Sequence, residues 1–451
     1  MIGPENNLKS AHKSVRDETA PGSAVRMSIP RTSSEAEKDK ASGPFSASIH
    51  DKILSQAERD KLKSILKACN EHNLKELQSL ATSKGGLLRD DIRQTAWPIL
   101  LGCGVKTEKS DLDWRSLDEH RDEEQVQLDV NRSFVYYPEG ETGSRKDARK
   151  SELSHVITTV LRQHRTLHYF QGYHDIVQVL LLVLGADAAI PAVARLSLLR
   201  IRDFMLPTMV GTEPHLQLVP AILYATDPQL CQHLSQTQPF FALAATLTLY
   251  AHDIEEYGDI ARLFDFLLAH EAAMSLYLFA VIVMSRKKEL LEIEPEEPEM
   301  LHSILSKLPK PLNLDGLISR AVEIYEQYPP DKLPCRVWSH VSLNSVLKTT
   351  RNIEVLHQQT LKDGEEFFKK QAEEIKRAEA WNARKQRMLL VARNYKRPVA
   401  LTGIAILVAV FALALRNTSL RSTLTQFSPI LANWHHRTGE ILQRFSAYIR
   451  M

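Results

Sequence analysis

The sequence lacks the motifs of the common nucleotide-dependent and metal-dependent enzymes. It contains no GxxxxGK(S/T) phosphate loop and no HExxH, GxSxG or GxGxxG motif. Its four cysteines are scattered and form no CxxC pair, which argues against a disulfide framework or a zinc site and suits a reducing cytosol. The formal net charge is only +2, so no overall field favours nucleic acid as a partner. A chain of this kind can still act by lending side chains to the active site of another protein.

Alternating strand patterns and repeats of fixed length are also absent. Helical spacing of apolar residues begins near Ser55 and continues to about residue 350, interrupted by turns that contain Pro, Gly or charged residues. Two helix starts have the spacing of a capping box, at Ser55 with Glu58 and at Asn73 with Glu76. We therefore predict an all-α domain over residues 51–350.

The first 50 residues have little apolar content. Residues 1–50 are rich in Ser, Pro, Gly and mixed charge, and Phe45 is their one aromatic residue. Such a segment buries too little apolar surface to offset the entropy lost on ordering, so we expect a disordered tail. The segment also lacks the apolar core of a signal peptide.

The chain after residue 350 changes character twice. Residues 351–397 are charged and contain no proline, which predicts a long solvated helix, a stalk outside the core. The next eighteen residues, 398–415, carry no charge and predict a short transmembrane helix, with a buried helix of a soluble domain as the alternative. The remaining segment, 416–451, has apolar residues at helical spacing and is expected to lie on the far membrane surface as an amphipathic helix.

Basic residues set the expected orientation of that span. Six of them precede it within fourteen residues that contain no acidic residue: Arg384, Lys385, Arg387, Arg393, Lys396 and Arg397. By the positive-inside rule, the long N-terminal part is cytosolic and the 416–451 tail lumenal. The short, alanine-rich span suits a thin bilayer such as that of the endoplasmic reticulum.

The stretch Tyr169-Phe170-Gln171-Gly172 is placed unusually, between predicted helices at 151–166 and 174–185. Glycine lets the chain turn at this junction and provides no side chain to cover its neighbour. We expect Gln171 to project from the junction; a buried amide that caps a helix end is the alternative.

A second candidate pair lies 39 residues earlier. Asp129 and Arg132 are three apart near the end of a predicted helix that Pro138 should stop. A carboxylate at this spacing can hold an arginine and direct it toward an anion. The alternative is a plain surface salt bridge, worth less than about 1 kcal/mol.

Two further pairs have the four-residue spacing of one helix face. Arg93 and Trp97 can stack, although an ordinary helix with a buried tryptophan has the same spacing. His164 and His168 are permissive for zinc, but no third ligand is evident, and we expect no metal site.

Three motifs occur in order: Arg93-x-x-x-Trp97, Val126-x-x-Asp129-x-x-Arg132 and Tyr169-x-Gln171-Gly172. Together they resemble the TBC domain of Rab GTPase-activating proteins, whose signatures are RxxxW, IxxDxxR and YxQG. The resemblance covers roughly residues 84–350, and Val126 in place of isoleucine is a conservative departure. A TBC domain followed by one C-terminal span resembles the branch of the family that is anchored in the endoplasmic reticulum. That branch acts on the Rab/Ypt GTPase of the ER-to-Golgi step.

The resemblance implies a GTPase activator that supplies two groups in trans. Arg132 would be the arginine finger that stabilises charge near the γ-phosphate, and Gln171 would position the attacking water. The chain would need no cofactor of its own, because GTP and Mg²⁺ would be held by a Rab/Ypt GTPase in its GTP form.

The other motif residues would support these two. The resemblance implies that Asp129 orients Arg132 and that Tyr169 and Gly172 shape the loop before the second helix. Arg93 and Trp97 would be structural, holding the N-terminal helices.

The expected protein is thus a single-pass membrane protein of the endoplasmic reticulum, attached through 398–415, with a cytosolic catalytic domain and no nucleic-acid partner. The alternative is a membrane-anchored scaffold or tether that binds Rabs without catalysis. TBC domains of that kind typically lack the arginine or the glutamine, and both are present here.

Overall fold

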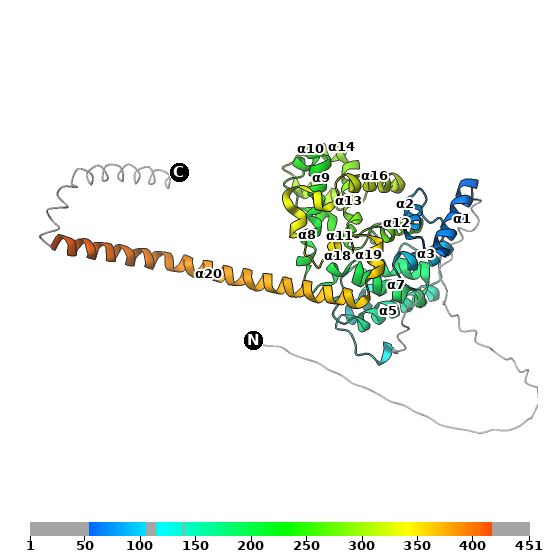
Figure 1. Cartoon of the computed structure of the whole chain (residues 1–451), viewed down its shortest axis with the longest axis horizontal. Helices are drawn as coiled ribbons and strands as arrows, with labels where there is room; N and C mark the ends of the chain where they lie inside the picture. Colours follow the sequence, from blue (N-terminus) through cyan, green and yellow to red (C-terminus); the bar gives the residue numbers. More distant parts are fainter. Residues whose placement is uncertain (1–53, 105–113, 139, 417–451) are drawn as a thin grey trace, which may run out of the picture. The chain divides into compact units, whose positions relative to one another are not determined.

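The computed structural model describes residues 54–104, 114–138 and 140–416, with side chains for all of them except 391–402, 404, 411 and 414–416. Helices joined by turns make up these residues, and no strand occurs among them (Figure 1). The all-α prediction is therefore confirmed. The predicted tail 1–50 lies outside the described residues, as does the predicted tail 416–451 apart from its first residue.

The α-helices run in chain order as α1 (Gln56–Asn70), α2 (Leu74–Thr82), α3 (Asp90–Leu100), α4 (Glu123–Asn131), α5 (Gly143–Gln163), α6 (Tyr173–Leu184), α7 (Ala186–Leu199), α8 (Glu213–Leu216), α9 (Leu218–Thr226), α10 (Pro228–His233), α11 (Leu243–Leu247), α12 (Tyr257–Ala269), α13 (Met274–Ser285), α14 (Lys287–Leu291), α15 (Pro298–Leu305), α16 (Leu314–Gln327), α17 (Val337–His340), α18 (Val346–Thr349), α19 (Ile353–Gln358) and α20 (Leu361–Arg416). Short 3₁₀ turns join several of them, including η3 (Arg202–Met205).

Capping explains where the first two helices begin. The Ser55 hydroxyl accepts a hydrogen bond from the backbone N–H of Glu58, whose carboxylate accepts one from the Ser55 N–H at 2.7 Å. The Asn73 side chain accepts the N–H of Glu76 at 3.2 Å. Each bond satisfies a donor that the first helical turn leaves unpaired, and both predicted starts are confirmed.

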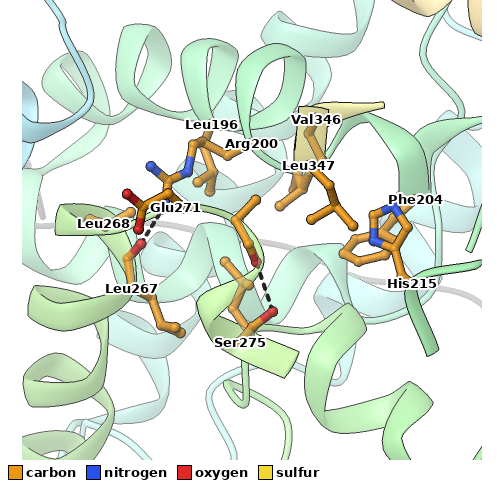
Figure 2. Close-up of a pocket in the computed structure, with 13 residues that line it drawn as sticks. Leu196, Arg200, Phe204, His215, Leu267, Leu268, Glu271, Ser275, Val346 and Leu347 are labelled. Atoms are coloured by element: carbon orange, nitrogen blue, oxygen red, sulfur yellow. Dashed lines mark hydrogen bonds between the residues drawn. The ribbon is translucent and has the colours of Figure 1, made fainter. Parts of the chain in front are cut away.

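Apolar helices form the centre of the domain. Nearly every residue of α6, α12 and α13 is buried, which is typical of helices surrounded by other helices. Helix α6 packs on α3, α5 and α7, and α13 packs on α9 and α16. A mostly apolar cavity lies between α7, η3, the α12–α13 junction and α18, with Leu196, Phe204 and Leu347 in its wall (Figure 2).

A buried carboxylate joins α3 to α12 and explains the first motif. Asp265 accepts hydrogen bonds from Arg93 Nε at 2.9 Å and from Trp97 Nε1 at 2.8 Å, and also from the Leu87 N–H. Arg93 and Trp97 therefore meet through a shared acceptor, where the sequence suggested stacking. Without these donors the buried charge of Asp265 would be costly, so the three side chains act as one unit.

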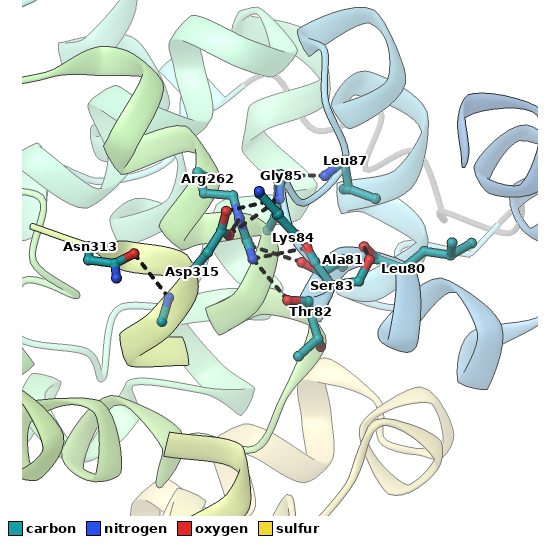
Figure 3. A network of polar contacts seen from close by, with 12 residues as sticks. Leu80, Ala81, Thr82, Ser83, Lys84, Gly85, Leu87, Arg262, Asn313 and Asp315 are labelled. Atoms are coloured by element: carbon teal, nitrogen blue, oxygen red, sulfur yellow. Dashed lines mark hydrogen bonds and ion pairs between the residues drawn. The ribbon is translucent and has the colours of Figure 1, made fainter. Parts of the chain in front are cut away.

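Helix α12 is tied to the end of α2 by a second polar contact. Arg262 donates to Asp315 of α16 at 2.9 Å and to the carbonyl oxygens of Ala81, Thr82 and Ser83 (Figure 3). Those carbonyls have no acceptor role inside the helix, because they lie at its end. One guanidinium thus caps α2 and holds it to two later helices.

The start of α20 corrects the predicted stalk at 351–397. The chain forms α19 and then α20, and the first turns of α20 belong to the core: Phe368 is 3% exposed, and Gly364 leaves room for Leu198, whose Cβ would lie 2.9 Å from an added side chain. Glu374 accepts hydrogen bonds from the side chains of Ser342 and Asn344, which precede α18. The charged composition hid this packing, because only a few of the residues in these turns contact the core.

Beyond the core, α20 continues to Arg416 through the segment 398–415. Its side chains are exposed from Lys376 to Leu390. Among the residues whose side chains are described, no helix combines the length and apolarity that a membrane span requires.

We predict that a fragment of residues 51–358 is less stable than one of residues 51–380. Burial of Phe368 alone contributes roughly 1.5–3 kcal/mol, and the shorter fragment lacks it. Urea unfolding followed by circular dichroism measures the difference. Equal midpoints for the two fragments would contradict the assignment of the α20 start to the core.

Candidate functional site

Arg132 lies immediately after the last residue of α4. Its backbone N–H still donates to the Asp129 carbonyl at 3.0 Å, and its side chain is 65% exposed. One guanidinium nitrogen, Nη2, binds the carboxylate of Asp129, which is 0% exposed. The pair is therefore more than a surface salt bridge, since its anion is buried and its cation reaches solvent.

The carboxylate of Asp129 collects three donors. Besides Arg132, Gln125 Nε2 donates to Oδ1 at 3.0 Å and the Tyr169 hydroxyl donates to Oδ2 at 2.9 Å. Burial by itself raises the pKa of Asp129, but the hydrogen bonds from Tyr169, Arg132 and Gln125 outweigh it and hold the pKa below the ordinary 3.8. Asp129 is thus charged at neutral pH and attracts the guanidinium.

Gln171 lies between the end of α5 and the start of α6. Its side chain is exposed, and its amide makes no hydrogen bond to any residue that the structure describes. The next residue, Gly172, has a φ of 98°, and an added Cβ would lie 2.6 Å from Thr248 Cγ2. Only glycine fits this turn, which leaves Gln171 projecting from the helix junction.

Tyr169 connects the two candidate segments. Its hydroxyl binds Asp129, and its backbone N–H donates to Asp122 Oδ2 at 2.9 Å, at the start of α4. Burial and the neighbouring Asp129 charge both raise the pKa of the Tyr169 phenol, so the hydroxyl keeps its proton and remains a donor. The structure therefore attaches the segment before Gln171 to the same carboxylate that holds Arg132.

Sequence reasoning missed the residues that extend this network. His174 Nδ1 lies 3.0 Å from the Tyr169 hydroxyl, and His174 Nε2 lies 3.3 Å from Asp175 Oδ1. His252 Nδ1 lies 3.0 Å from Asp175 Oδ2, and this hydrogen bond raises the pKa of His252. His174 and Asp175 lie two and three residues after the YxQG motif and could have been noticed; no sequence signal connects His252 to them.

The remaining candidates lie elsewhere. Arg93 and Trp97 surround the Asp265 carboxylate and not that of Asp129. His164 Nδ1 binds Glu365 of α20 at 2.8 Å, so one of the two histidines at zinc-like spacing has a carboxylate partner. Among the described residues no group of three or more His, Cys, Asp or Glu side chains is placed to hold a metal ion. None of the predicted site residues lines the cavity of Figure 2.

Comparison with known proteins gives the family. Residues 90–291, which include all three motifs, match the model of the Rab-GTPase-TBC domain. "TBC1 domain family member 20" of Bos taurus is 35% identical over 280 residues, which are 61% of this chain and 69% of that protein. The chain belongs to the Rab-GTPase-TBC domain family.

The matches to further relatives of this TBC-domain chain cover similar fractions of the relatives' lengths. "GTPase-activating protein gyp10" of Schizosaccharomyces pombe is 32% identical over 287 residues, 62% of this chain and 76% of that protein. The Mus musculus form of TBC1 domain family member 20 is 37% identical, and the match spans 65% of its length. The crystal structure of the Ypt/Rab-GAP domain of Gyp1p aligns with 59% of this chain and 99% of that one, at 14% identity and a TM-score of 0.47.

We predict that Asp129→Asn lowers the free energy of unfolding at pH 7 by about 1–3 kcal/mol, because hydrogen bonds to a charged acceptor are lost in a buried site. Asp118→Asn is the control, since that side chain is 91% exposed. The folded pKa of Asp129 is lowered, so its stabilisation is complete above the ordinary 3.8 and is lost as the pH falls through the folded value. Urea unfolding from pH 7 to pH 3 measures the difference in unfolding free energy between the unmodified chain and Asp129→Asn. This difference should shrink only at the acid end of the range. A difference that does not change with pH would contradict a charged Asp129.

Proposed function

We propose that this TBC-domain chain is a GTPase-activating protein for a Rab/Ypt small GTPase in its GTP form. One observation carries the proposal: an exposed arginine and the segment before an exposed glutamine are fixed to one buried carboxylate. Small GTPases hydrolyse GTP slowly alone, and an arginine supplied in trans is worth about 10³–10⁵ in rate, or roughly 4–7 kcal/mol of barrier. The chain needs no cofactor for this role, because the GTPase holds GTP and Mg²⁺.

Arg132 is the proposed arginine finger. Among the described residues its side chain has Asp129 as its hydrogen-bonding partner, which leaves most of its five N–H donors for a ligand. In the transition state those donors would bind the oxygens of the transferring phosphoryl group as charge develops on them. Asp129 limits the rotation of the guanidinium, so less entropy is lost when the finger enters the nucleotide site.

Gln171 is proposed to position the attacking water. Its amide offers an acceptor for a water proton and two donors, and it makes no bond in the described structure that would have to break. Gly172 fixes the turn that exposes it, and Tyr169 fixes the chain before it. In this role Gln171 would replace the water-orienting glutamine of the GTPase itself.

The surface around Arg132 supports contact with a protein. Among the residues that the structure describes between 54 and 208, the exposed large apolar side chains are Leu66, Leu128, Val135 and Tyr136, and three of these four lie within four residues of Arg132 in the sequence. Exposed apolar and aromatic residues beside a functional group are typical of protein interfaces.

We further propose that 398–415 anchors the chain in the endoplasmic reticulum membrane, with the TBC domain in the cytosol and a role in ER-to-Golgi transport. The support is the sequence: eighteen residues without a charge follow six basic residues.

The two fingers give the direct test of the catalytic proposal. Arg132→Ala should abolish accelerated hydrolysis, a loss of about 10³-fold or more, while Rab binding and folding remain. Arg132→Lys should be nearly as damaging, because an ammonium group cannot reproduce the guanidinium fork. Gln171→Ala should lose about two or more orders of magnitude. Phosphate release from a panel of Rabs loaded with GTP, with the 51–380 fragment, measures these rates.

Arg145→Ala is the matched control for the arginine, because its side chain is 60% exposed and also lies beside a buried carboxylate, that of Glu141. It should retain full activity. Wild-type rates for Arg132→Ala on every responsive Rab would exclude the finger. Tight binding of Rabs by the unmodified chain without acceleration would favour the alternative, a scaffold or tether.

The membrane proposal predicts that the full chain stays with membranes during alkaline carbonate extraction, whereas a chain ending at residue 397 is released. An uncharged helix of this length leaves the bilayer only when the bilayer itself is dissolved. Release of the full chain by carbonate would rule out a membrane span at 398–415.

A further inference from the structure

A buried glutamine on α6 contacts the segment that carries Arg132. Gln178 is 4% exposed, and its Oε1 accepts the backbone N–H of Phe134 at 3.0 Å. Phe134 is two residues after Arg132, and α6 begins directly after Gly172. This single hydrogen bond therefore joins the chain that follows the proposed arginine finger to the helix that follows the proposed glutamine finger.

The partner of Gln178 is a backbone group with an unusual conformation. Phe134 has a φ of 60°, a left-handed value that residues with a side chain rarely adopt. Its side chain is 2% exposed, so its N–H is held close to the core and requires an acceptor. Gln178 supplies that acceptor and favours the one backbone turn in which Arg132 points to the surface while Phe134 points inward.

The position of Gln178 within α6 makes packing alone a poor explanation for it. The residues around it in the helix are apolar and buried, including Val177, Val179 and Leu180. A buried amide in such a helix costs free energy unless its polar atoms are hydrogen-bonded. An aliphatic residue would fill this space without that cost, and the bond to Phe134 is what an aliphatic residue could not make.

Among the contacts that join the arginine segment to the glutamine segment, two lie on either side of Arg132. Before Arg132, the Asp129 carboxylate binds the Tyr169 hydroxyl; after Arg132, the Phe134 N–H binds Gln178. The first contact is two residues before Gln171 and the second is on the helix after it. Without the second contact, the chain after Arg132 would lose its hydrogen bond to α6, while the contact before Arg132 would remain.

We propose that Gln178 is a positioning residue for Arg132: it fixes the offset between the two finger side chains and does not itself touch the nucleotide. The inference rests on the proposed GTPase-activating function. Displacement of a catalytic group by about 1 Å can cost 10²-fold in rate, so loss of this bond should lower kcat while the docking surface, and hence KM, stays the same.

The test compares Gln178→Met, which keeps the length of the side chain but removes the acceptor, with Gln178→Glu, which keeps an acceptor oxygen. The full chain, purified in detergent, is assayed on the GTP-loaded Rab that responds most strongly in the panel. We expect Gln178→Met to lower kcat about 10- to 100-fold with KM changed less than about twofold. Gln178→Glu should have a kcat within about threefold of that of the unmodified chain, because its carboxylate can accept a hydrogen bond from the Phe134 N–H.

Gln371→Met is the matched control. Gln371 is also a buried glutamine, 2% exposed on α20, and its Oε1 has no hydrogen-bond partner in the described structure. This variant should keep kcat, and melting temperatures of both Met variants should show that both are folded. Three results would overturn the inference. Gln178→Met could retain kcat, Gln371→Met could lose as much kcat as Gln178→Met, or Gln178→Glu could lose as much as Gln178→Met. Absence of acceleration by the unmodified chain on every Rab would instead refute the proposed function.

Discussion

The buried carboxylate of Asp129 is the interaction on which the candidate site depends. A charge removed from water has to be paired and hydrogen-bonded, and Asp129 obtains its donors from its own helix, from Arg132 and from Tyr169 forty residues later. Satisfying this one anion therefore fixes the helix end that carries Arg132 and the loop that leads to Gln171. The same anion leaves the guanidinium at the surface, because only one of its nitrogens is needed for the pair.

The rest of the domain provides rigid support for these two segments. The apolar helix α6 begins at the glycine after Gln171, and its packing against α3, α5 and α7 holds that start in place. The loop between α5 and α6 is also held at its beginning, where His164 binds Glu365 at the core end of α20. If 398–415 is anchored as proposed, the helix that reaches the membrane also contacts the loop that carries Gln171, the proposed glutamine finger.

Contacts between near neighbours in sequence could be predicted, and long-range contacts could not. The three-residue spacing predicted that Asp129 would hold Arg132, and glycine after Gln171 predicted a projecting side chain. No spacing rule connects Tyr169 to Asp129 or Gln178 to Phe134, since those pairs depend on how α4 and α6 pack. The packing of Phe368 was missed for a related reason: the composition of 351–397 is dominated by charge, whereas a few residues in its first turns, Phe368 among them, pack on the core.

The central claim is that Arg132 and Gln171 act together on a nucleotide held by another protein. The most direct measurement is the structure of the TBC domain bound to a responsive Rab that carries GDP and aluminium fluoride, which mimic the transferring phosphoryl group. The account predicts the guanidinium of Arg132 and the amide of Gln171 both within about 3 Å of the fluoride group or its attacking water, with the bond from Tyr169 to Asp129 intact. A complex in which either side chain points away from the nucleotide would contradict it.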